Sequence, residues 1–270
     1  MASFSVVNNI SASYAQSNLT STHIGLQQAI TRLSSGLRIN QAGDDAAGLA
    51  VANSYRATQA VLNQGISNAN DGLSTLQIKD GAMSNISTLL DRLSTLATES
   101  ASGSSSVNRT QLNNEFQDVL KEIDREANVA GLTAATGFSV FVSNDGANGA
   151  VGGTIGAADT TALGLKPSGT YVNISTSGAA ATAVGTIATA VTTLGTAQGT
   201  VGTLENRLQF AISLANSQVV SNQAAESRIR DANIAQESAN MSRYSVLTQS
   251  GVAALAQANQ QSSSVLRLLQ

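Results

Sequence analysis

The residues that most often carry chemistry are few and scattered in this chain. His23 is the only histidine and there is no cysteine, which excludes disulfides and thiolate metal sites and leaves a zinc site without a second strong ligand. Asp44 and Asp45 are adjacent carboxylates after Gly43, a position that favours a helix N-cap over acid–base catalysis. No serine lies in a Gly-x-Ser-x-Gly elbow, and the glycine runs lack the Lys-Ser/Thr of a phosphate loop. We therefore expect no enzyme activity, no metal and no cofactor.

The composition indicates long, thin helices rather than one spherical core. Charged residues make up 11% of the chain and aromatic residues 3%, with one Pro in 270 residues, whereas an average soluble domain is about 25% charged. The net charge of −3 argues against a basic nucleic-acid-binding face. We find no apolar run long enough to span a bilayer, and residues 1–16 lack the basic start and apolar run of a secretory signal. Neither nucleic acid nor a membrane is expected as a partner.

Apolar residues recur at alternating steps of four and three residues, which predicts helices. Any functional site must therefore be positioned by helices. The expected helices cover about residues 3–37, 45–100 with a register slip after Leu76, a third around 112–123, then 187–215 and 227–269. Between them, residues 131–185 are rich in Gly, Thr, Ser and Ala. Their short alternating pieces predict β-hairpins and exposed loops.

The order of helices, insert and helices predicts a mainly α fold. We expect a long antiparallel helical bundle or coiled coil formed by the N- and C-terminal arms, with a small β-hairpin and loop insert. Residues 1–43 have no acidic residue, and residues 244–270 carry one charge, Arg267, so their polar faces are expected to meet other copies rather than water. The predicted self-assembly seam consists of Leu26, Ile30, Leu33, Leu62, Ile66, Leu73, Leu90, Leu93, Leu204, Leu208 and Leu255.

Several segments near the two ends resemble bacterial flagellin, the filament subunit of the flagellum. They are Leu-Ser-Ser-Gly-Leu-Arg-Ile-Asn at 33–40, Asp-Asp-Ala-Ala-Gly-Leu-Ala-Val-Ala-Asn at 44–53, Asn-Ala-Asn-Asp-Gly-Leu at 68–73, Ser-Arg-Ile-Arg-Asp-Ala-Asn at 227–233 and Leu-Ala-Gln-Ala-Asn-Gln at 255–260. They occur in the family's order and at matching distances from both ends. The resemblance spans nearly the whole chain apart from its middle.

The resemblance implies a domain plan and a set of partners. Residues 1–43 and 227–270 would form an inner coiled-coil filament core, 44–130 and 186–226 a helical outer tube, and 131–185 a surface insert. The chain would be exported unfolded and would polymerise outside the cell into a helical filament for swimming motility. Its partners would be copies of itself, the flagellar export apparatus, an export chaperone, and cap and junction proteins.

Arg92, Leu96 and Glu115 form a second candidate site. If the helices that carry them run side by side, these three residues share one exposed patch, which by itself is an ordinary contact between subunits. By resemblance they match the flagellin surface bound by the vertebrate Toll-like receptor that senses flagellin. Both roles are compatible with one surface.

Two other functions fit parts of the sequence. A hook–filament junction protein shares both terminal arms, but the matches at 44–53 and 255–260 favour flagellin. An adhesive or glycan-binding surface protein would have to use residues 132–186, whose aromatic platforms are only Phe138, Phe141 and Tyr171. The prediction is therefore a non-enzymatic filament subunit.

Overall fold

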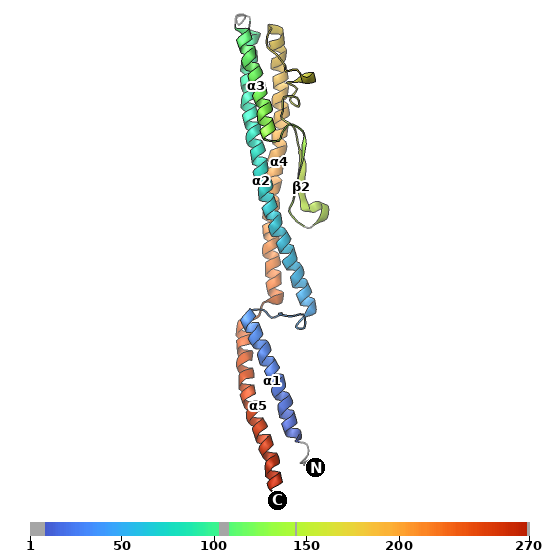
Figure 1. Cartoon of the computed structure of the whole chain (residues 1–270), viewed down its shortest axis with the longest axis vertical. Coiled ribbons are helices and arrows are strands. Elements are labelled where there is room, and N and C mark those ends of the chain that lie inside the picture. Colours follow the sequence, from blue (N-terminus) through green and yellow to red (C-terminus); the bar gives the residue numbers. More distant parts are fainter. Residues whose placement is uncertain (1–8, 103–107, 144, 269–270) are drawn as a thin grey trace. The chain divides into compact units, whose positions relative to one another are not determined.

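The computed structural model describes residues 9–102, 108–143 and 145–268, and these are mainly helical (Figure 1). The chain divides into two compact units: unit 1 combines residues 1–57 with 221–270, and unit 2 comprises residues 58–220. The elements are α1 (Ile10–Ser35), α2 (Ala46–Ala101), α3 (Arg109–Val129), β1 (Thr136–Phe141), the short 3₁₀ helix η2 (Gly146–Gly149), β2 (Ala150–Ile155), the 3₁₀ helix η3 (Pro167–Gly169), α4 (Ser177–Arg230) and α5 (Ile234–Leu268). The predicted mainly α fold with a small β-hairpin is confirmed.

Unit 2 is organised by an antiparallel seam between α2 and α4. The Ser177 hydroxyl at the start of α4 donates to the Ala101 carbonyl at the end of α2 (2.8 Å). A four-three repeat keeps one stripe of a helix facing its partner, and the buried positions of α4 follow it without interruption. They are Ala180, Ala183, Ile187, Ala190, Leu194, Ala197, Val201, Leu204 and Leu208.

The facing stripe of α2 also keeps this repeat, from Leu62 to Ser100. The predicted register slip after Leu76 is therefore wrong. It was inferred because Gly65, Gly72 and Lys79 bring no apolar side chain to the stripe, so that Ile66 and Leu73 were assigned to it instead. Each of the three has a partner that explains it.

The two glycines make room for the β-hairpin. A Cβ at Gly65 would lie 1.9 Å from the carbonyl oxygen of Val142, and one at Gly72 would lie 2.6 Å from a methyl group of Val140. β1 and β2 are antiparallel, with Phe141 opposite Ala150. The hairpin therefore packs directly on the backbone of α2, and its valines belong to the core of unit 2.

The Lys79 side chain caps the C-terminal end of α3 and does not contribute to the apolar stripe. Its Nζ donates to the carbonyls of Ala130 and Gly131 (both 3.0 Å), which satisfies acceptors that a helix C-terminus leaves open. Burial lowers the pKa of the Lys79 ammonium group.

The loop after β2 is held to α3 by Asp124. One carboxylate oxygen accepts from the backbone N–H and the hydroxyl of Thr160 (2.9 and 2.7 Å), and the other accepts from the hydroxyl of Tyr171 (2.7 Å). Burial alone would raise the pKa of Asp124, but the hydrogen bonds from Tyr171 and Thr160 and the charge of Lys166 outweigh it and hold the pKa below its ordinary value. The predicted exposed loop is therefore an anchored part of unit 2.

Residues 171–174 do not form the short strand that their alternation predicts. The Ile174 N–H donates to the Asn113 side chain (3.0 Å), and its carbonyl accepts from the Ser100 hydroxyl (2.6 Å). Side chains of α2 and α3 thus satisfy backbone groups that a strand partner would take.

The bounds of the last two helices also differ from the prediction. α4 begins at Ser177, about ten residues before the predicted start at 187, because its first turns bury alanines rather than large side chains. The predicted helix over 227–269 is interrupted at 231–233, where the Asn233 side chain accepts from the N–H of Gln236 (3.2 Å) and caps α5. The predicted first helix begins at residue 3, and its residues 3–8 lie outside the described ranges.

Helix α4 also corrects the expectation that no run is long enough to cross a bilayer. By length and composition alone, α4 is long and apolar enough to cross a bilayer. Its seam from Ala180 to Leu208 is nevertheless buried within unit 2. This is the pattern of a helix that packs one stripe against its neighbours.

We predict that Gly65→Ala destabilises unit 2 by about 1–3 kcal/mol, because the added methyl would overlap the Val142 carbonyl. Gly81→Ala is the matched control on the same helix: nothing lies within 4 Å of its added Cβ, so it should stabilise the helix by up to about 1 kcal/mol. Urea unfolding followed by circular dichroism measures both changes. Equal stabilities for the two variants would contradict the packing of the hairpin on α2.

Glu205 on α4 gives a pH-dependent prediction. Among the described side chains its Oε1 is the buried atom without a hydrogen-bond partner, and burial, with the nearby charge of Asp80, raises the pKa of Glu205. The ionised form of Glu205 is therefore disfavoured in the folded state. The free energy of unfolding of unit 2 is higher while this carboxyl is protonated and falls as pH rises through its folded pKa.

Glu205→Gln should then stabilise unit 2 at neutral pH, because the amide carries no charge that burial and Asp80 would disfavour. Below the ordinary pKa of glutamate the gain should vanish, because the wild-type carboxyl is protonated in both states. Thermal melts across roughly pH 3 to 8, the range in which carboxyl groups titrate, test this. A gain that does not change with pH would contradict the role of charge.

Candidate self-assembly surfaces

Unit 1 is built on an antiparallel pair of helices, α1 and α5. The Asn9 side-chain amide donates to the Ala258 carbonyl (3.0 Å) near one end of the pair. Near the other end, Arg32 forms an ion pair with Glu237 (Nη1 to Oε1, 3.4 Å). The pair thus joins segments from the two ends of the sequence, as the sequence analysis expects.

Glycines let the two helices approach closely. A Cβ at Gly25 of α1 would lie 2.7 Å from the ring of Tyr244 on α5, and one at Gly251 of α5 would lie 3.1 Å from Leu19 on α1. These contacts were not predicted from the sequence. A glycine inside a helical repeat often marks close packing, so these glycines were the feature of the sequence that could have predicted the contacts.

The α1–α5 pair buries little. Leu26, Leu33 and Leu255 were predicted as seam residues, and they face the pair but are only half-buried. Among the described residues of unit 1 the fully buried side chains are Ala29, Ile39, Ala52 and Glu237. Apolar burial is the main favourable term in folding, so unit 1 by itself has a weak core.

Large apolar side chains are exposed on both helices of the pair. Ile30, a predicted seam residue, is 48% exposed, because the neighbouring Ala29 takes the buried position. Further exposed apolar residues are Ile10, Tyr14 and Ile24 on α1, and Ile234, Val246, Leu247 and Val252 on α5. Exposed apolar surface of this kind marks an interaction site.

The other predicted seam residues belong to unit 2, and most are inside it. Ile66 and Leu73 are half-buried, because Gly65 and Gly72 take the stripe positions beside them. The remaining five are fully buried: Leu62, Leu90, Leu93, Leu204 and Leu208. Buried side chains cannot contact a second copy, so these form the core of one chain and the expectation of a seam between copies is corrected for them.

Backbone pairing joins the ends of α1 and α5. Leu37 and Asp231 form an isolated antiparallel bridge. Arg38 donates its N–H to the Arg230 carbonyl (2.6 Å). Gly36 ends α1 with φ at +71°, a left-handed conformation that glycine adopts without strain.

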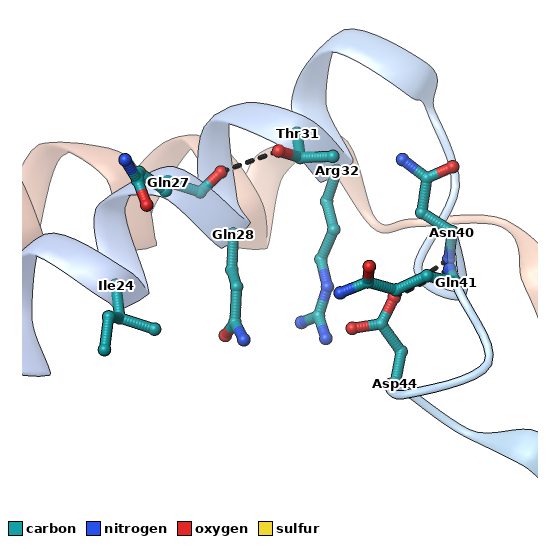
Figure 2. A pocket seen from close by; sticks show the side chains of 8 residues that line it. All are labelled: Ile24, Gln27, Gln28, Thr31, Arg32, Asn40, Gln41 and Asp44. Carbon is teal, nitrogen blue, oxygen red and sulfur yellow. Dashed lines mark hydrogen bonds between the residues drawn. The ribbon is translucent and has the colours of Figure 1, made fainter.

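A groove of about 530 Å³ opens in unit 1 beside these connections (Figure 2). Its side chains come from one face of α1 and from the segment before α2. They are Ile24, Gln27, Gln28, Thr31, Arg32, Asn40, Gln41 and Asp44. Carboxamides dominate this lining, and they can both donate and accept hydrogen bonds. The groove is therefore a polar surface that also carries the charged side chains of Arg32 and Asp44.

Asp44 and Asp45 fix the segment that borders the groove. Asp44 accepts from the N–H groups of Asn40 and Gln41 (both 3.1 Å). These two hydrogen bonds, with a smaller contribution from the charge of Arg32, lower the pKa of Asp44 against an opposing effect of burial. Asp45 accepts from the N–H of Gly48 (2.8 Å) and caps α2, so the predicted capping role is confirmed for Asp45.

Nothing in this arrangement favours catalysis. The Thr31 hydroxyl donates to the carbonyl of Gln27 in its own helix (2.9 Å). His23 is exposed on α1. Within the described ranges, no group of three His, Asp or Glu side chains is close enough to hold a metal ion.

The predicted patch on α2 and α3 is only partly present. Arg92 and Glu115 form an exposed ion pair, with Nε 2.9 Å from Oε1. Leu96 is 1% exposed and packs in the core of unit 2. The prediction of three exposed residues is therefore wrong for Leu96, which lies on the side of α2 that faces the other helices.

These features define a class of protein: a helical structural subunit whose paired ends leave apolar surface for further copies. Comparison with known families agrees. The family model of the bacterial flagellin N-terminal helical region matches residues 6–137, and that of the bacterial flagellin C-terminal helical region matches residues 184–269. The chain belongs to the bacterial flagellin family.

Individual relatives extend over nearly the whole chain. The flagellar filament 33 kDa core protein of Treponema phagedenis is 35% identical over 97% of this chain and 98% of its own length. Flagellin of Halalkalibacterium halodurans is 36% identical over 90% of this chain and 91% of its own length. A crystal structure of Bacillus cereus flagellin covers 59% of this chain and 94% of its own, at 26% identity and a TM-score of 0.48. The family membership indicates a filament subunit and does not favour the hook–filament junction protein.

The thin core of unit 1 predicts a contrast in backbone protection. In the free subunit, amide hydrogens of α1 and α5 should exchange at least about tenfold faster than those of residues 86–97, which carry the core of α2. Hydrogen exchange with mass spectrometry measures both, and residues 86–97 are the internal control. Similar protection in the two units would show that unit 1 is complete without other copies.

Proposed function

We propose that this chain polymerises through unit 1, whose helices are completed by the helices of other copies. The observation that carries the proposal is the set of exposed apolar side chains on α1 and α5, next to a pair interface that is only half-buried. The low charge of residues 1–43 and 244–270 supports it, since a solvated helix normally has a charged face.

Membership of the flagellin family supports the domain plan. Residues 1–43 and 227–270 form the inner filament core, where uncharged helices can pack on one another. Residues 44–130 and 186–226 form the outer tube, which the continuous seam of unit 2 makes rigid. Residues 131–185 lie toward the filament surface. Contacts that repeat from copy to copy without closing a ring give an open filament.

Family membership also supports a location and partners. The chain is exported unfolded and polymerises outside the cell, with the export apparatus, an export chaperone, and cap and junction proteins as partners. The lack of cysteine suits such export, because no disulfide can form on the way. For the receptor that senses flagellin, we propose a contact limited to Arg92 and Glu115, because Leu96 is buried.

Substitution on α5 tests the assembly role of unit 1. Val252→Asp should slow seeded polymerisation at least about tenfold, because burying an unpaired carboxylate between copies costs several kcal/mol, and tenfold corresponds to about 1.4 kcal/mol. Val252 is 56% exposed in the single chain, so thermal melting of unit 2 should not change. Sedimentation and electron microscopy measure polymer yield.

Ser139→Asp is the matched control, since Ser139 is exposed on β1 in the proposed surface insert. It should polymerise like the wild type. Wild-type polymerisation of Val252→Asp would contradict the role of α5. If the wild-type chain itself formed only short caps or stayed monomeric, the junction-protein function would be favoured.

A further inference from the structure

Methionine is the residue of this chain that a peroxide oxidises most readily, because the sequence has no cysteine and no tryptophan. The three methionines are Met1, Met83 and Met241, and Met1 lies outside the described ranges. Met83 is 0% exposed in the core of unit 2, whereas Met241 on α5 is half-buried in unit 1. A peroxide dissolved in water can therefore reach Met241 more easily than Met83.

Met241 lies on the stripe of α5 that faces α1 (Figure 1). The positions of this stripe are buried or half-buried and repeat at steps of four and three. They are Glu237, Met241, Tyr244, Thr248, Gly251, Leu255 and Ala258. Two of them have contacts with α1 on either side of Met241. Glu237 pairs with Arg32 (3.4 Å), and the Tyr244 ring lies 2.7 Å from the position of a Cβ added at Gly25.

These two contacts fix what Met241 faces. Because α1 and α5 run antiparallel, Met241 lies opposite the turns of α1 between Gly25 and Arg32. This part of α1 contains Ala29, which is 2% exposed and is the fully buried residue among those described in α1. Met241 therefore belongs to the layer in which the α1–α5 pair is most tightly closed.

Oxidation changes this layer from apolar to polar. The Met241 sulfur attacks one oxygen of hydrogen peroxide, the O–O bond breaks, and the departing hydroxide takes the proton of the transferred oxygen and leaves as water. The sulfur is oxidised to a sulfoxide and the peroxide is reduced. A sulfoxide is polar, and burying a polar group without a hydrogen-bond partner is unfavourable. The polar side chains of this layer are already engaged, since Arg32 and Asn240 both donate to Glu237 (3.4 and 3.3 Å).

We propose that Met241 is an oxidation site through which a peroxide blocks polymerisation of the free subunit. The inference rests on the proposed function, in which other copies complete unit 1, and it adds a chemical control of that step. Met241 is accessible while the α1–α5 pair stands alone, and it becomes covered when further helices pack on the pair. The block is reversible, because methionine sulfoxide reductases return the sulfoxide to the thioether.

Hydrogen peroxide treatment followed by peptide mass spectrometry tests the site. In the free subunit Met241 should gain one oxygen atom at least about tenfold faster than Met83, which is the internal control. In the polymer the reaction at Met241 should slow by a similar factor. Equal rates at the two methionines, or a faster reaction at Met83, would overturn the assignment of the site. An unchanged rate at Met241 in the polymer would contradict its coverage by other copies.

Polymerisation of the treated subunit tests the effect. Oxidised wild type should have a critical concentration at least about tenfold higher than untreated wild type, and methionine sulfoxide reductases A and B should restore it. Met241→Leu is the matched control, because leucine has a similar volume and no sulfur. It should polymerise normally before and after peroxide. Both proteins keep Met1 and Met83, so the comparison isolates Met241.

A second variant imitates the modification without an oxidant. Met241→Gln places a polar amide in the same layer and should also raise the critical concentration about tenfold. Normal polymerisation by Met241→Gln or by the oxidised wild type would overturn the inference, and so would an equal effect of peroxide on Met241→Leu. Failure of the untreated wild type to polymerise would overturn the proposed function instead, and the oxidation rates at Met241 and Met83 would still decide the site.

Discussion

The seam between α2 and α4 has to hold one register from Leu62 to Ser100, and the rest of unit 2 is arranged around that requirement. A four-three repeat keeps the same two stripes in contact only if every layer is filled. Where α2 has glycine, the hairpin supplies the missing volume with Val140 and Val142. Where it has Lys79, the end of α3 supplies acceptors for the ammonium group. The insert and α3 are therefore parts of the seam and not additions to it.

Unit 1 uses the same repeat for a different purpose. Its glycines bring α1 and α5 into close contact, as at Gly25 and Tyr244, but few side chains are fully buried and apolar ones remain outside. Two helices cannot enclose a core by themselves, whereas unit 2 has α3, α4 and the hairpin around α2. Unit 2 therefore has its core within one chain, whereas unit 1 leaves the apolar surface that the proposed packing with other copies would cover.

The sequence predicted the kinds of element well and their contacts less well. The helical repeats, the hairpin and the flagellin segments at both ends are visible as residue patterns. The misassigned positions share one cause: large apolar residues were preferred as seam positions. Ile66 and Leu73 were chosen, although Gly65 and Gly72 occupy the seam because the hairpin approaches there. Leu96 was expected to be exposed, because the packing of α3 against α2 cannot be read from either helix alone.

Scanning calorimetry of the free subunit tests most directly whether unit 2 alone is a complete fold. Unfolding absorbs about 0.7 kcal/mol of heat per residue near 60 °C, which corresponds to an unfolding enthalpy of roughly 110 kcal/mol for unit 2 and roughly 190 kcal/mol for the whole chain. A single transition near the lower value, rising toward the higher one per chain after polymerisation, is the predicted result. A transition near the higher value in the free subunit would contradict it, because unit 1 would then be fully packed without any other copy.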